Sequence, residues 1–70
     1  MLLVRNAGPT IGGRALWVVT EAGDDATLQG PDRLGNHASS FDTFLDASHA
    51  AQWRVEQGLD EGPVRKGGRW

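Results

Sequence analysis

Apolar residues occur in two short runs near the start of the chain and in one helical pattern in its second half. Residues 2–5 begin with three consecutive apolar side chains and lead into the turn-forming cluster 6–10, which predicts a short strand. Residues 14–20 contain Leu16, Trp17 and two valines, so both faces of an extended segment would carry apolar side chains. That pattern is typical of a central strand covered on at least part of each face.

Turn-forming residues separate this strand from a weaker strand signal. Residues 22–25 include Gly23 and two aspartates, which favour turns. Residues 26–29 are expected to return antiparallel, which predicts a hairpin over residues 14–29. A polar loop over residues 30–36 follows, with two glycines and a proline.

A helix of about five turns is predicted from Ser39 to Gly58. Ser39 begins a Ser-x-x-acid sequence that ends at Asp42, a pattern that satisfies unpaired amide groups in the first turn of a helix. Gly58 favours termination because glycine readily ends a helix. One mostly apolar stripe, interrupted by two polar positions, should pack on the hairpin. Its members are Phe41, Phe44, Leu45, Ala51 and Val55, with Ser48 and Gln52 between them.

The predicted fold class is α+β, a small antiparallel hairpin or three-stranded sheet packed on one C-terminal helix. Residues 2–5 supply the third strand in the larger version. Residues 1–58 are expected to form a single small domain. Residues 59–70 contain Gly-Pro and Gly-Gly pairs and change from acidic to basic, so they are expected to be a flexible or partner-ordered tail.

Composition narrows the classes of function. The chain has no cysteine, which excludes disulfides, thiolate zinc sites and a cysteine nucleophile. Fifteen of the 70 residues are Leu, Ile, Val or Phe, a modest core for a chain of a size that usually needs a staple or a partner. The formal net charge of −2 makes nucleic acid an unexpected partner, because that binding needs clustered Lys and Arg.

The N-terminal apolar run is too short for a signal peptide. It reaches four residues before Arg5, and no later run approaches the roughly 20 residues that cross a bilayer. The expected location is therefore the cytoplasm, with no membrane partner.

Two surfaces are candidates for binding another protein. One is a helix flank that sets a tryptophan, a residue enriched at interface centres, among polar groups. It consists of Asp42, Asp46, His49, Trp53 and Glu56. The other is the basic end of the chain, suited to a partner's groove, with Arg65, Lys66, Arg69 and Trp70. In the alternative interpretation, Trp53 folds under the N-terminal strand or the tail as a second small core.

Three functional hypotheses follow. The leading one is a non-enzymatic protein-binding module, such as an inhibitor, an adaptor or an accessory subunit. The second is a homo-oligomeric structural component that pairs a strand edge or helix flank with its own copy. The third is a small metal-dependent enzyme centred on Asp42, Asp46 and His49, whose spacing aligns them on one side of a helix. No catalytic triad is visible, and the leading hypothesis requires no cofactor.

Overall fold

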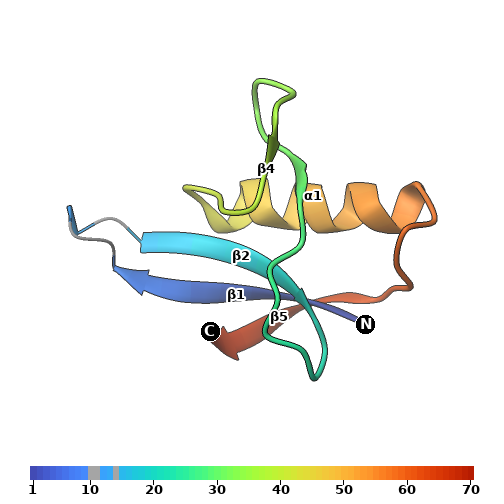
Figure 1. The fold of residues 1–70 in the computed structure, drawn as a ribbon, viewed down its shortest axis with the longest axis horizontal. Helices are drawn as coiled ribbons and strands as arrows, with labels where there is room; N and C mark the ends of the chain where they lie inside the picture. Colours follow the sequence, from blue (N-terminus) through green and yellow to red (C-terminus); the bar gives the residue numbers. More distant parts are fainter. Residues whose placement is uncertain (10–11, 14) are drawn as a thin grey trace.

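The computed structural model describes residues 1–9, 12–13 and 15–70. Two sheets and one helix make up the fold. Strands β2, β1 and β5 form a mixed three-stranded sheet in that order, and β3 and β4 form a small antiparallel pair. The elements in chain order are β1 (Leu2–Pro9), β2 (Ala15–Glu21), β3 (Gly30–Pro31), β4 (His37–Ala38), α1 (Phe44–Glu56) and β5 (Val64–Arg69). The predicted α+β class is therefore confirmed (Figure 1).

The central strand is β1 rather than the segment predicted from residues 14–20. β1 pairs antiparallel with β2, where Val4 lies opposite Val19, and parallel with β5, where Val4 lies opposite Lys66. β1 also continues beyond residue 5 through the expected turn. Gly8 adopts φ +82° and the pairing with β2 shifts register there, so the strand absorbs an irregularity instead of ending.

Segments later in the chain cover the outer edge of β2. Trp17 and Phe41 exchange two backbone hydrogen bonds of 2.8 Å, and the amide of Leu28 donates to the Val19 carbonyl. The hairpin expected over residues 14–29 is thus wrong, because β2 pairs with β1 and residues 26–29 add only isolated contacts. Arg14, at the expected start of the strand, lies outside the described residues.

The helix begins at Phe44 and not at Ser39. Thr43 is the N-cap: its backbone is extended and its hydroxyl accepts a hydrogen bond of 3.1 Å from the Asp46 amide. The bridge between Phe41 and Trp17 keeps the preceding residues out of the helix, which is why the predicted cap is wrong. The predicted stop is confirmed, since Gly58 adopts φ +75° and its amide bonds back to the last turn.

The buried face of α1 consists of small residues: Ala47, Ala50 and Ala51. They pack on a cluster formed by Leu2, Val4, Val19 and Phe41, so the helix lies across one face of the sheet (Figure 1). The expected stripe is confirmed in part, since Phe41 and Ala51 are buried and Val55 packs against the core cluster. Leu45 is 62% exposed and Phe44 38% exposed, because the face of α1 that meets the sheet is the one that carries Ala47, Ala50 and Ala51.

Residues 59–70, expected as a tail, supply the third strand of the sheet. The Leu2 amide donates to the Pro63 carbonyl and the Trp70 amide to the Asn6 carbonyl, both at 2.9 Å. Val64 packs against the core cluster. The fold thus extends past residue 58, because the second edge of β1 offers these residues backbone partners within their own chain.

A close approach between α1 and β3, at Ala50 and Gly30, provides a test of this packing. A Cβ placed on Gly30 would lie 2.7 Å from the Ala50 Cβ and 3.1 Å from its backbone. Gly30→Ala is therefore expected to lower the free energy of unfolding by about 1–3 kcal/mol, measured by urea denaturation. Gly68→Ala is the control: its Cβ meets nothing within 4 Å, so it should be neutral or stabilise by up to about 1 kcal/mol. Equal stabilities of the two variants would contradict the packing.

The helix N-terminus provides a second test. Thr43→Ala removes the hydroxyl that accepts from the Asp46 amide and should cost about 1 kcal/mol of unfolding free energy. Ser39→Ala, at the position predicted from sequence, should change stability by less than about 0.5 kcal/mol. Urea denaturation of both variants checks the assignment, which a larger loss at Ser39 would overturn.

Candidate binding site

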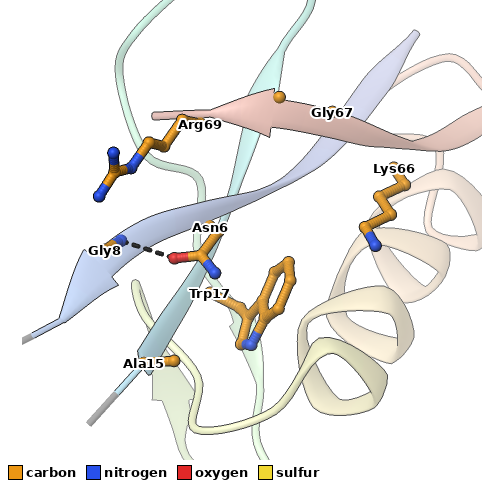
Figure 2. A pocket seen from close by; sticks show the side chains of 8 residues that line it. Asn6, Gly8, Ala15, Trp17, Lys66, Gly67 and Arg69 are labelled. Carbon is orange, nitrogen blue, oxygen red and sulfur yellow. Dashed lines mark hydrogen bonds between the residues drawn. The ribbon is translucent and has the colours of Figure 1, made fainter. Parts of the chain in front are cut away.

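A pocket of about 470 Å³ opens beside the C-terminal half of β5. Three strands contribute to it, since its lining comes from β1, β2 and β5 (Figure 2). Its residues are Asn6, Gly8, Ala15, Trp17, Lys66, Gly67, Gly68 and Arg69. Lys66 and Arg69 were predicted binding residues, and the structure brings them together at one site.

Phe44 of α1 supports two of the lining side chains. The Trp17 ring meets the Phe44 ring edge to face, with centroids 5.3 Å apart and planes at 76°. The Lys66 ammonium lies 5.7 Å from the Phe44 ring centroid, within the range of a cation–π contact. The exposed face of the first helical turn therefore holds a tryptophan and a lysine at one end of the pocket.

An irregularity in β5 explains why Lys66 and Arg69 share this pocket. In a regular strand, residues three apart point to opposite faces of the sheet. Here Val4 pairs with Lys66 but Asn6 pairs with Arg69, so β5 carries one extra residue between them. The bulge brings both cationic residues to the pocket, separated by Gly67 and Gly68.

Gly67 is required at the bulge by a close approach to β1. A Cβ on Gly67 would lie 2.8 Å from the Arg5 Cγ and 3.0 Å from the Leu3 Cβ. The next residue, Gly68, has open space around it. Gly67 would therefore direct a side chain to the face of Leu3 and Arg5, opposite α1, and Gly68 leaves the strand without a side chain before Arg69.

The pocket lining carries hydrogen-bond donors and no acidic side chain among the residues described. The Asn6 Oδ1 accepts a 2.7 Å hydrogen bond from the Gly8 amide, which directs the Asn6 Nδ2 donor away from that bond. Figure 2 shows Asn6 and Trp17 between Lys66 on one side and Arg69 on the other. The arrangement is suited to a negatively charged group against an aromatic wall.

Positive charge on β5 lacks carboxylate partners within the described residues. Arg5, Arg33 and Arg54 each form an ion pair, with Asp25, Asp46 and Asp60 respectively. No such pair involves the three basic side chains of β5 in this part of the chain. Among the described residues, β5 is thus a basic segment without carboxylate partners, in a protein of formal net charge −2.

The other two predicted residues at this end of the chain lie outside the pocket. Arg65 is exposed on β5. Trp70 is 50% exposed and its Nε1 donates a 2.8 Å hydrogen bond to the Asp25 carbonyl. That bond, with the one from Arg5 to the Arg69 carbonyl, holds the end of β5 in place.

The helix flank is partly engaged with the segment around β3 and β4. The Asp46 carboxylate accepts hydrogen bonds of 2.8 and 3.0 Å from Arg33, and the Trp53 ring meets the His37 ring edge to face at 5.2 Å. His49 and Glu56 are exposed. Trp53 is half-buried against this loop, which neither sequence interpretation anticipated.

Asp42 precedes the helix and shares a second pocket, of about 420 Å³, with Asp46 and Arg33. The alignment of Asp42 with the helix flank is therefore wrong, since only residues from Phe44 onward are helical. Within residues 1–9, 12–13 and 15–70, no group of three or more His, Cys, Asp or Glu side chains is placed to hold a metal ion. The described chain also contains no helix of sufficient length and apolar character to cross a membrane.

Sequence reasoning missed the part of the pocket contributed by β1 and β2. Trp17 was interpreted as a residue of a central strand, and Asn6 and Gly8 as turn formers. Ala15 and Trp17 do share one face by strand periodicity, which was an available signal. The pairing that brings this face to β5 has no local sequence signal.

Comparison with known protein families, with curated proteins and with solved structures finds no significant match to this chain.

The ion pair between Arg33 and Asp46 predicts an acid dependence of stability. The hydrogen bond from Arg33 is the largest cause that lowers the pKa of Asp46 from its ordinary 3.8, and partial burial opposes it. Because the folded-state pKa is the lower one, the stabilisation is present above pH 3.8 and is lost as the pH falls through the folded pKa.

Arg33→Gln should therefore raise the pKa of Asp46, measured by NMR titration of its carboxyl carbon. Arg65→Gln removes the same charge from an exposed position and should leave the Asp46 titration unchanged. Asp46→Asn should reduce the loss of stability in acid. An Asp46 pKa that is equal in the wild type and in Arg33→Gln would contradict the assignment.

Proposed function

We propose that the protein is a non-enzymatic binding module that receives an extended segment of another protein at the outer edge of β5. The observation that carries this proposal is an edge strand that no other described segment covers and whose basic side chains have no carboxylate partner among the described residues. Addition of a strand to an open sheet edge is a common mode of peptide recognition, in which main-chain hydrogen bonds supply much of the affinity.

The direction of the backbone hydrogen bonds of β5 indicates that its outer edge is open to a partner strand. The Leu2 amide donates to the Pro63 carbonyl, so the parallel pattern directs the backbone groups of Arg65 toward β1. The N–H and C=O groups of Val64 and Lys66 then point away from the sheet. In the described part of the chain no backbone hydrogen bond reaches that outer edge.

The opposite edge of the sheet is less suited to a partner. Phe41 and Leu28 already form backbone hydrogen bonds with β2. The helix flank is also less suited, because the side chains of Asp46 and Trp53 are engaged within the chain. These contacts favour β5 over the flank as the primary binding surface.

Charge favours another protein over a second copy of the chain. Pairing two β5 strands would bring Arg65, Lys66 and Arg69 of each copy together, and like charges oppose edge-to-edge association. The homo-oligomeric alternative therefore requires a different surface. Light scattering at micromolar concentration distinguishes a monomer from such an assembly.

A pull-down from the native host tests the edge directly. Lys66→Pro removes an outward N–H and should be tolerated on an edge strand, whereas Lys66→Gln removes the charge and keeps the N–H. We expect Lys66→Pro to retain at least about fivefold less of the partner than the wild type does, and Lys66→Gln to show a smaller loss. Quantitative mass spectrometry measures the amount retained.

The matched control is His49→Ala, which alters the helix flank and should retain the partner. Urea denaturation should show that all the variants are folded. Equal retention on Lys66→Pro and the wild type, selective loss on His49→Ala, or no retained partner would each refute the proposed edge.

A further inference from the structure

We infer that the segment received by β5 is acidic, and that the pocket between Lys66 and Arg69 takes a carboxylate side chain of that segment. The inference rests on the proposed use of the β5 edge and adds the chemistry of the partner. It identifies the occupant as an extended peptide segment with Asp or Glu on the side chain row that faces α1.

The position of the pocket relative to the edge is the first argument. An added strand would lie about 5 Å beyond β5, and its side chains would alternate between the two faces of the sheet. Lys66 and Arg69 both line the face with Trp17, because the bulge in β5 places them there. A side chain of the added strand on this face therefore shares it with two cations.

The glycine pair is the second argument. Cross-strand neighbours in a sheet normally meet side chain to side chain. A side chain at Gly67 would point to the opposite face, at Leu3 and Arg5, and Gly68 presents none. A side chain from the added strand therefore meets no obstacle from these two positions as it extends toward Asn6 and Trp17. A glutamate carboxylate that extends in this direction enters the face of the sheet that carries both cations, with Lys66 beside Phe44 and Arg69 beside Gly8 (Figure 2).

The chemistry of the lining is the third argument. Lys66, Arg69 and the Asn6 amide are donors, and the described lining contains no carboxylate that would compete for them. Charge-assisted hydrogen bonds to a carboxylate are about twice as strong as neutral ones. Phe44 holds Lys66 beside the pocket through the cation–π contact. Lys66 is therefore partly ordered before a ligand binds, which lowers the entropy cost of binding.

Peptide titrations followed by amide NMR test the inference. The probes are three ten-residue peptides of alternating Thr-Glu, Thr-Gln and Thr-Lys sequence. We expect the Glu peptide to bind at least about tenfold more tightly than the Gln peptide at low salt, with shifts at the Gly67 and Gly68 amides and the Trp17 indole N–H. Added salt should reduce that preference, and the Lys peptide should bind most weakly.

Two variants test which basic residues cause the preference for the Glu peptide over the Gln peptide. Lys66→Gln with Arg69→Gln should bind the Glu and Gln peptides equally, while the β5 amides still shift. Arg65→Gln, on the same strand but outside the pocket, should keep most of the preference. Circular dichroism and urea denaturation establish that both variants are folded.

The outcomes separate this inference from the proposed function. Equal binding of the Glu and Gln peptides by the wild type, with shifts along β5, overturns the acidic pocket and leaves edge binding intact. A preference lost in Arg65→Gln but kept in the double variant also overturns the pocket. No shift of β5 amides with any peptide counts against both.

Discussion

Parallel pairing of β1 with β5 is the interaction on which the rest of the structure depends. It joins two strands that lie far apart in the sequence. The entropy lost in closing the long loop between them must be offset by backbone hydrogen bonds and by burial. Leu2 and Val4 are fully buried beneath α1, and Val64 extends the same apolar cluster. The pairing thereby makes β1 the middle of the sheet and β5 an edge.

The two edges of this sheet differ because the chain covers only one of them in the part described. Between β2 and α1 it returns twice to β2, at Leu28 and at Phe41. From Asp60, held by Arg54, it leads into β5 and forms the outer side of the sheet. The bulge with its glycine pair then gives this edge a pocket as well as a row of backbone groups.

The helix connects the core with the candidate site. Its alanine face lies close to Gly30, and two larger apolar side chains, Phe44 and Leu45, lie at the margin of the core. Phe44 is one of these, and it supports both Trp17 and Lys66. With small residues filling the core side of α1, Phe44 remains at its margin, where it contacts two side chains of the pocket.

Local features of the sequence determined the elements whose signals lie within a few residues. The apolar run around Trp17 specified a strand, Gly58 specified the end of the helix, and the basic residues of 65–69 identified a binding candidate. Strand propensity and left-handed glycine conformations act over such short distances. The α+β class follows from these elements together.

Tertiary structure alone decided the strand order, the start of the helix and the pocket. Each of these depends on which distant segments compete for the same backbone groups. Phe41 pairs with Trp17 and so leaves the capping role to Thr43, and the second edge of β1 takes up residues whose composition indicated a tail. Pairing partners are selected by burial and hydrogen bonding between remote segments, and a one-residue bulge reverses the face of a side chain.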